Sequence, residues 1–248
     1  MKIQQNQKKS AKIDLIQGDC LEVMKDIPDG SIDLIVTSPP YNVWRNRRTQ
    51  ARKKHYWDRI NIIYDKCSDK MTDEAYQEWQ ILFINECVRV LKATGTIVYN
   101  HKDQIFNFKA LSPLEWILRS NAIYRQRITW DRQGMQAFNN VRFYRVEEDL
   151  YILGKNAKGF TWHKEFAKYL SIWRITPEKG VDHPAPFPEE IPKRCIEAFS
   201  NENDIVLDPF TGSGTVGKVA KSLNRNFIGI DISEDYLKIA EKRINENL

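Results

Sequence analysis

The sequence predicts an α/β fold in which a doubly wound, mostly parallel sheet carries helices on both faces. Short apolar stretches with strand character alternate along the chain with segments whose apolar residues recur at helical spacing. "SIDLIVT" (31–37) is apolar almost throughout, as in strands covered on both faces of a sheet. This alternation favours a parallel sheet, and the length of 248 residues suits a single domain over 1–248.

The first half of the chain predicts two strands, a helix and a third strand. "KIDLIQGD" (12–19) alternates apolar and polar residues and ends in Gly-Asp, which indicates a strand before 31–37. Residues 72–92 have the apolar period of a helix, and Thr72 can cap its first turn. "GTIVYN" (95–100) indicates the next strand, so the helix should end before this glycine.

The second half continues the alternation. The predicted helices are 111–122, 187–200, 214–224 and 233–246, the last capped by Ser233. The predicted strands are 123–131, 147–155, 204–210 and 226–232. Residues 156–180 show no clear period, so no regular element is expected there.

Composition places the chain among globular proteins, with 42% hydrophobic and 29% charged residues. The N-terminal "MKIQQNQKKSAK" lacks the apolar stretch of a signal peptide, and no apolar run is long enough to span a bilayer. We therefore expect a cytoplasmic protein with no membrane partner. The four cysteines are scattered without metal-ligand spacing, so neither a metal site nor a disulfide framework is expected.

The positive charge of the chain is concentrated in one segment. Residues 45–59, "RNRRTQARKKHYWDR", carry seven Lys or Arg and one Asp, while the net charge of the whole chain is only +5. Such a segment is either a solvated loop or a surface that faces a polyanion, and composition alone favours neither.

A glycine-rich loop follows the strand predicted at 204–210. In "DPFTGSGTVG" (208–217) the glycines satisfy G-x-G-x-x-G between a strand and a helix, and Asp231 ends the next strand about 20 residues later. Glycines let a ligand approach the backbone, and the acid can accept hydrogen bonds from ribose hydroxyls. A plain tight turn would explain the glycines alone, but the context favours a ligand that contains adenosine.

Two observations argue against a nicotinamide dinucleotide and an oxidoreductase. The unit lies near the C-terminal end, with one helix after its second strand, whereas a dinucleotide domain usually continues with another half. The Asp208 carboxylate directly before the loop would repel a pyrophosphate. It would suit a cationic ligand such as S-adenosylmethionine, with its amino group and sulfonium.

The stretch "TSPPY" (37–41) ends the strand predicted at 31–37. Pro40 has no N–H to donate to a sheet, and Ser38 and Pro39 each precede a proline, so this turn is extended and rigid. By itself it could be a structural turn. An oxidoreductase would leave both this turn and the basic segment unexplained.

Together, "TSPPY" and "DPFTGSGT" resemble the DNA amino-methyltransferases, and their order resembles the circularly permuted beta group of that family. The resemblance covers about residues 13–246. It implies a Rossmann-like methyltransferase sheet with a small recognition insertion, S-adenosylmethionine as cofactor and double-stranded DNA as substrate. We further expect a monomer or a homodimer, with a cognate restriction endonuclease as an optional partner.

The resemblance assigns catalysis to Ser38, Pro39, Pro40 and Tyr41. The Ser38 hydroxyl and the Pro39 carbonyl would accept hydrogen bonds from the exocyclic amino group of a base, and Tyr41 would stack on that base. "HPAPFP" (183–188) resembles the segment on the methionine side of the cofactor, and Gly18-Asp19 the strand end near its adenine. The implied cofactor-binding residues are Asp19, Cys20, Thr37, Phe187, Pro188, Asp208, Phe210, Thr211, Gly212, Ser213, Gly214 and Asp231.

A base inside a duplex must be flipped out before it can be methylated, which requires a surface that grips phosphates. The resemblance places sequence recognition in the segment 132–180, whose Arg, Gln and Asn side chains are of the types that read base edges. The basic loop at 45–70 directly follows Tyr41, so it is also expected to contact DNA. The expected DNA-binding residues are Arg45, Arg47, Arg48, Arg52, Lys53, Lys54, Arg132 and Arg142.

Within the family resemblance, Ser38 favours N4 of cytosine over N6 of adenine, because members with serine at this position mostly act on cytosine. No cysteine follows a proline, which disfavours methylation of cytosine carbon 5. An inactive DNA-binding module is a further alternative, against which the intact Ser38, Tyr41, Asp208 and Asp231 argue. RNA or protein amide methylation also stays open, although such enzymes usually carry Asn where this chain has Ser38.

Overall fold

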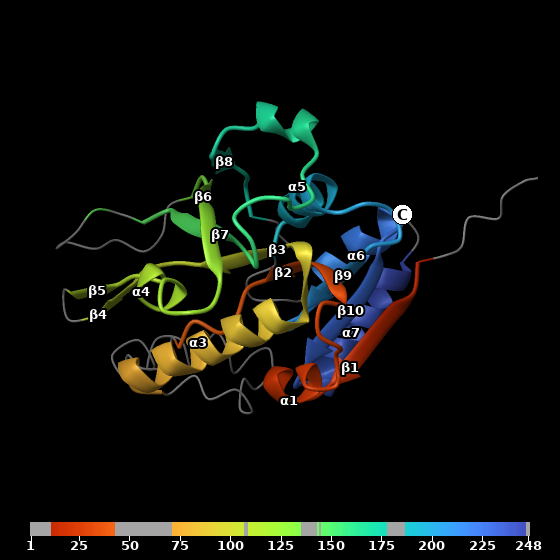
Figure 1. Ribbon diagram of the computed structural model, residues 1–248, viewed down its shortest axis with the longest axis horizontal. Coiled ribbons are helices and arrows are strands. Elements are labelled where there is room, and N and C mark those ends of the chain that lie inside the picture. The colour runs from red at the N-terminus through yellow and green to blue at the C-terminus, as the bar shows by residue number, and fades with distance from the viewer. Residues whose placement is uncertain are drawn as a thin grey trace, which may run out of the picture.

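The computed structural model describes residues 11–42, 71–106, 109–134, 143, 145–177 and 187–246. These residues form one sheet with helices on both faces and a small separate hairpin (Figure 1). The predicted basic loop 45–70 and Arg142 lie outside the described residues. None of the helices in the described part has the length and apolar character needed to cross a membrane.

In the described part of the chain, the large sheet has eight strands in the order β1-β10-β9-β2-β3-β7-β6-β8. The strands are β1 Ile13–Gln17, β2 Ile32–Thr37, β3 Leu91–His101, β6 Ile123–Asp131, β7 Glu147–Gly154, β8 Ile172–Arg174, β9 Ile205–Asp208 and β10 Asn226–Asp231. Pairing is parallel from β1 through β3, antiparallel where β7 meets β3 and β6, and parallel between β6 and β8. The predicted doubly wound, mostly parallel sheet is therefore confirmed.

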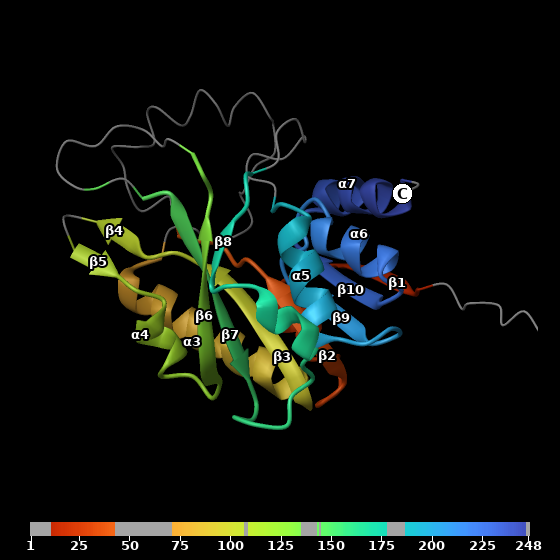
Figure 2. The same cartoon turned by 90° about the horizontal axis from the view of Figure 1, so that it is seen from above.

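Helices cover both faces of this sheet because its central strands are apolar on both sides. Ile35 packs in a cluster with α1 (Cys20–Met24), α3 (Asp73–Val90) and α4 (Leu114–Ile117). Leu34 and Val36, its neighbours in β2, pack in a second cluster with the remaining helices. These are α5 Glu190–Phe199, α6 Thr215–Ser222 and α7 Glu234–Asn245. Figure 2 shows α3 and α5 on opposite sides of the sheet.

Thr72 and Ser233 cap α3 and α7 as predicted, but the predicted end of α3 is wrong. Thr72 accepts a hydrogen bond from Ala75 N at 3.2 Å, and Ser233 accepts one from Tyr236 N. The prediction that α3 runs to residue 92 and that the next strand starts at Gly95 is wrong. β3 begins at Leu91, whose fully buried side chain pairs in register with Ile32, so sheet pairing and burial end the helix early.

Three short elements differ from the sequence prediction. The first strand ends at Gln17, because Asp19 caps α1 by accepting hydrogen bonds from Leu21 N and Glu22 N. The helix predicted at 111–122 is only Leu114–Ile117, because Leu111 ends a hairpin strand. This hairpin pairs β4 (Gln104–Phe106) with β5 (Lys109–Leu111).

The segment at 156–180 contains regular structure that the sequence pattern does not show. A 3-10 helix, η2 (Lys164–Lys168), is followed by β8 at the edge of the sheet. His163 N donates to Ala198 O at 3.0 Å, which ties this segment to the end of α5. The described part of the predicted recognition segment 132–180 is therefore built largely into the core fold, with β7 between β3 and β6.

Candidate active site

Both sequence motifs lie at one edge of the sheet, where the parallel strands end. β9 ends at Asp208, and β2, its neighbour, ends at Thr37 directly before the serine–proline–proline–tyrosine turn. The helix after β9 covers one face of the sheet, and α3, the next described helix after β2, covers the other. Such a switch point opens a crevice beyond the strand ends, and open α/β sheets bind ligands there.

The glycine-rich loop is fastened to β10 through Asp231. One carboxylate oxygen of Asp231 accepts from Gly212 N at 2.9 Å and the other from Ser233 N at 2.9 Å. Gly214 has a φ of 78°, and a Cβ there would lie 2.7 Å from the Cβ of Ala240 in α7. The loop therefore depends on this glycine both for its backbone conformation and for its packing on α7.

Asp208 is a buried carboxylate at the start of the same loop, with 4% of its surface exposed. Its Oδ1 accepts a hydrogen bond from Phe210 N at 3.1 Å. Burial, with a smaller contribution from the nearby charge of Asp231, raises the pKa of Asp208 to about 7. Among the described residues no Lys or Arg forms an ion pair with it, so the site holds a costly negative charge that a cationic ligand would stabilise.

The remaining predicted cofactor residues fall into two groups. Gly18 N donates to Asp231 O at 3.0 Å, which brings Asp19 and the buried Cys20 to the end of β10. Phe210 packs on Phe83 of α3, with ring centroids 5.1 Å apart. These positions are therefore close to the glycine loop.

Phe187 and Pro188 lie at the start of α5. Phe187 meets the ring of Trp130 in β6 edge-on, with centroids 6.0 Å apart, and Pro188 is buried. These contacts are with other residues of the protein. The predicted role of Phe187 and Pro188 beside the methionine part of the cofactor therefore stays a prediction.

The serine–proline–proline–tyrosine turn is held by two carbonyl contacts. Tyr76 of α3 donates its hydroxyl to Pro40 O at 2.7 Å, and Gln104 of β4 donates to Tyr41 O at 2.7 Å. His101, at the end of β3, lies beneath the Tyr41 ring at a centroid distance of 4.4 Å. The turn is thus fixed by hydrogen bonds from α3 and β4 in addition to its own prolines.

The side chains of Ser38 and Tyr41 enter a polar cluster that the sequence analysis missed. Their hydroxyls lie 3.0 Å apart, and both reach Asn100 Oδ1, at 3.1 Å from Ser38 and 2.8 Å from Tyr41. Tyr41 Oη also lies 3.2 Å from Glu148 Oε2. A polar residue at the end of a predicted parallel strand could have indicated Asn100, whereas Glu148 stands at the start of an antiparallel strand and gives no such signal.

Of the predicted DNA-binding residues, the structure describes Arg132 alone. Its guanidinium donates to Glu148 Oε1 at 2.7 Å and lies over the Trp130 ring at 5.3 Å. Lys102 approaches the same carboxylate oxygen at 3.2 Å. Arg45, Arg47, Arg48, Arg52, Lys53, Lys54 and Arg142 all lie outside the described residues.

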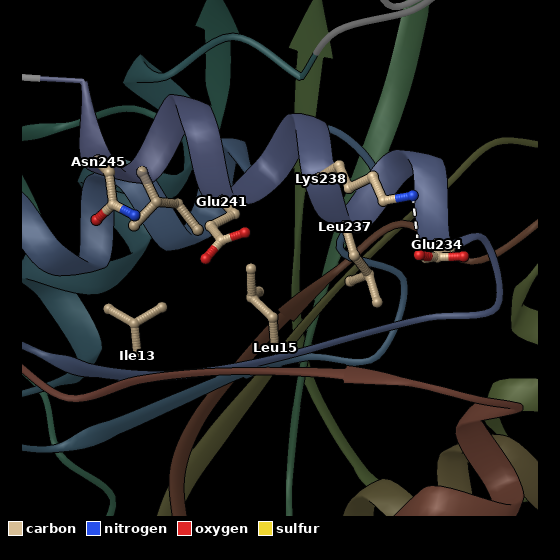
Figure 3. A pocket seen from close by; sticks show the side chains of 8 residues that line it. Ile13, Leu15, Glu234, Leu237, Lys238, Glu241 and Asn245 are labelled. Carbon is tan, nitrogen blue, oxygen red and sulfur yellow. Dashed lines mark ion pairs between the residues drawn. The ribbon is translucent and has the colours of Figure 1, made fainter.

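A separate open hollow lies between β1 and α7 (Figure 3). Ile13 and Leu15 face it from the strand, and an ion pair between Lys238 and Glu234 at 2.8 Å borders it on the helix. None of the predicted site residues lines this hollow, so it is distinct from the strand-end crevice.

A rigid turn with amino-group acceptors beside a nucleotide-type loop defines the class of the enzyme. It is an S-adenosylmethionine-dependent amino-methyltransferase. The chain belongs to the DNA methylase family of N6 and N4 methyltransferases, whose model matches residues 32–242.

Curated relatives support the same assignment. The type II methyltransferase M.HinfI of Haemophilus influenzae is 31% identical, over 94% of this chain and 68% of its own length. M.HpaI of Haemophilus parainfluenzae, also a type II methyltransferase, is 31% identical over 93% of this chain and 74% of its own.

Solved structures share the fold. The PvuII DNA methyltransferase, which is cytosine-N4-specific, superposes with a TM-score of 0.76 over 96% of this chain and 88% of its own, at 17% identity. The complex of M1.HpyAVI with S-adenosylmethionine has a TM-score of 0.63, 25% identity, and covers 94% of this chain and 99% of its own.

S-adenosylmethionine fits the charges of the strand-end crevice. It is the cofactor of this chain, and it supplies an electrophilic methyl group on a positively charged sulfur. The buried Asp208, which no cation of the described residues neutralises, suits such a ligand. The predicted dinucleotide alternative, an oxidoreductase, is excluded by the family assignment.

Proposed function

We propose that this protein is a site-specific DNA methyltransferase that methylates the exocyclic N4 of a flipped cytosine. The observation that carries the proposal is the Ser38 hydroxyl, which stands at the strand-end crevice next to the cofactor loop, within a rigid turn. N6 of adenine is the alternative target, since both bases present an amino group beside a ring nitrogen.

The turn supplies hydrogen-bond acceptors rather than a nucleophile. An exocyclic amino nitrogen is a weak nucleophile because its lone pair is delocalised into the ring, and it must become tetrahedral to attack. Acceptors at Ser38 Oγ and the Pro39 carbonyl favour that change and stabilise the positive charge that develops on the nitrogen. Catalysis thus needs neither a covalent intermediate nor a metal.

Tyr41 would present its ring to the flipped base. Its hydroxyl is turned toward Asn100 and Glu148, so the ring rather than the hydroxyl is left for stacking. Stacking of a base on an aromatic ring contributes about 1–3 kcal/mol.

The choice of cytosine rests on Ser38 at the first position of the turn. Family members with serine there mostly act on cytosine, and the cytosine-N4-specific PvuII enzyme shares the fold. The preference for cytosine follows from this likeness, because hydrogen bonds to Ser38 Oγ and the Pro39 carbonyl would serve adenine equally well.

DNA would be held by the basic loop that follows Tyr41. Lysine and arginine side chains that neutralise phosphates dominate non-specific affinity for DNA. Arg132 and Arg142, within the segment proposed for sequence recognition, would add further contacts. The resemblance to type II methyltransferases further suggests a cytoplasmic enzyme, monomeric or dimeric, that is paired with a restriction endonuclease.

The test is to express the chain in a host without other DNA methylation and to sequence the modified bases of its DNA. N4-methylcytosine in one recurring sequence context is the expected result. N6-methyladenine in such a context would refute the cytosine assignment and leave the enzyme class intact. Unmodified DNA, with the protein folded and S-adenosylmethionine bound, would refute the proposed function.

A further inference from the structure

Three groups form a continuous chain from the turn into the protein interior. Ser38 Oγ lies 3.0 Å from Tyr41 Oη, and Tyr41 Oη lies 3.2 Å from Glu148 Oε2. Each distance is within or close to the range of a hydrogen bond through which a proton can pass. The chain therefore connects the predicted amino-group acceptor with a carboxylate.

The two oxygens of the Glu148 carboxylate, at the end of this series of hydrogen bonds, have different neighbours. Glu148 Oε1 faces cations, with Arg132 Nη1 at 2.7 Å and Lys102 Nζ at 3.2 Å. Oε2 faces the Tyr41 hydroxyl. Both cations lie on the Oε1 side, so Oε2 is the carboxylate oxygen that faces the Tyr41 hydroxyl as a proton acceptor.

Asn100 directs the two hydroxyls without being able to take their protons. Its side-chain nitrogen donates to Asp149 O at 3.1 Å, which aims Oδ1 at Ser38 and Tyr41. An amide oxygen accepts hydrogen bonds but is not basic enough to hold a proton near neutral pH. Among the described residues that contact these two hydroxyls, Glu148 is therefore the group that can accept one.

We propose that Glu148 is the terminal proton acceptor of a relay, Ser38–Tyr41–Glu148, that removes the proton released when the amino group of the base is methylated. This inference rests on the proposed function, because it requires an amino group at Ser38.

The base nitrogen forms a bond to the methyl carbon as the bond between methyl and sulfur breaks, and the nitrogen becomes positively charged. It then gives one proton to Ser38 Oγ, while Ser38 passes its own proton to Tyr41 Oη and Tyr41 passes its proton to Glu148 Oε2. Both hydroxyls are restored, and the neutral Glu148 later loses the proton to solvent.

The pKa of Tyr41 suits a group that passes on a proton while staying neutral itself. Burial raises the pKa of the Tyr41 hydroxyl well above its usual range, and the charge of Glu148 raises it further. Tyr41 therefore keeps its proton in the resting enzyme and can only exchange one proton for another. With Tyr41 donating to Glu148, Ser38 Oγ keeps a lone pair for the amino group, so the relay also orients the acceptor in the transition state.

The test compares Glu148→Gln, Tyr41→Phe and the double variant in single-turnover methylation of DNA, together with their affinities for DNA and cofactor. Each single variant should lose about 100-fold in rate, the lower end of what a positioned proton acceptor contributes, with affinities changed only a few-fold. Because the two groups act in series, the double variant should be no slower than either single variant.

The neighbouring Glu147 supplies a matched control. Its carboxylate pairs with Arg145 at 2.7 Å, away from the turn, so Glu147→Gln removes one charge at an adjacent position and should keep the wild-type rate. The groups that face Glu148 are Tyr41, Lys102 and Arg132.

A rate for Glu148→Gln within a few-fold of wild type would overturn the relay. Additive losses of rate in the double variant would also overturn it. The same holds if Glu148→Gln loses rate together with affinity or folding while Tyr41→Phe stays fully active. A wild-type enzyme that methylates no DNA would instead refute the proposed function itself, and the relay with it.

Discussion

Replacing Asp208 by asparagine should stabilise the protein without ligand and weaken its affinity for S-adenosylmethionine. Asp208 is 4% exposed, and burial raises its pKa to about 7 from the ordinary value of 3.8. Asparagine has nearly the same shape and can still accept the hydrogen bond from Phe210 N. The substitution therefore removes the buried charge and little else.

The magnitude follows from the rise in the pKa of Asp208 from 3.8 to about 7. Each unit corresponds to about 1.4 kcal/mol, so ionised Asp208 costs the folded state up to about 4 kcal/mol. Because the folded pKa is raised, the folded state binds the proton more tightly than the unfolded chain. The free energy of unfolding therefore falls as pH rises from about 4 to about 7, and the full cost is present above that range.

Urea denaturation at about pH 8 and about pH 4 measures this effect. Asp208→Asn should be more stable than wild type by up to about 4 kcal/mol at the higher pH, and the difference should vanish at the lower one. Asp26→Asn, at an exposed position, is the charge-matched control and should change little. Calorimetry should show that the wild-type affinity for cofactor rises with pH through about 7, and that Asp208→Asn loses this rise.

Equal stability of wild type and Asp208→Asn at both pH values would refute the reasoning. A loss of stability at both would do the same, because Asp208 would then be a stabilising group rather than a strained one. Unchanged cofactor affinity in Asp208→Asn would show that Asp208 is not part of the cofactor site.

Three further predictions concern the two motifs and the basic loop. Asp231→Ala should weaken S-adenosylmethionine binding, measured by calorimetry, tens-fold or less, because it removes a predicted ribose acceptor and the hydrogen bond that holds Gly212. Unchanged affinity would contradict the placement of Asp231 in the cofactor site. Ser38→Ala should lower kcat far more than it lowers DNA affinity, since its hydrogen bond strengthens as the nitrogen becomes tetrahedral; proportional losses would point to simple binding. Neutralising four basic loop residues together should reduce the slope of log affinity for DNA against log salt concentration by up to about 0.9 per lost phosphate contact. An unchanged slope would show that the loop does not contact DNA. These four are Arg47, Arg48, Lys53 and Lys54.

The order of the large elements could be predicted from the sequence because burial dictates it. Strands such as β2 are apolar on both faces, and the helices around them carry one apolar stripe and capping residues such as Thr72 and Ser233. The short elements could not be predicted in this way. β4, β5 and β8 have three residues each, too few to show a period, and their positions depend on the partner strand.

The motifs of the site were visible in the sequence, but its polar interior was not. Asn100 and Glu148 lie 59 and 107 residues from Tyr41 along the chain. Asn100 meets it because β3 pairs parallel with β2 so that Tyr99 lies opposite Thr37, and Glu148 meets it because β7 pairs antiparallel with β3. A single sequence does not specify that register, so the contacts of Ser38 and Tyr41 required the fold. Similarly, Arg132 was predicted to contact DNA from its residue type, without sight of its ion pair with Glu148.

The most direct test of the central claim is single-turnover transfer of a labelled methyl group from S-adenosylmethionine to DNA by the purified protein. The DNA is then digested and its nucleosides are resolved by mass spectrometry. The label should appear on an exocyclic nitrogen, as N4-methylcytosine, and Ser38→Ala should lose most of the rate while still binding DNA and cofactor. Label on carbon 5 of cytosine, no label in DNA, or an undiminished rate in Ser38→Ala would contradict this account.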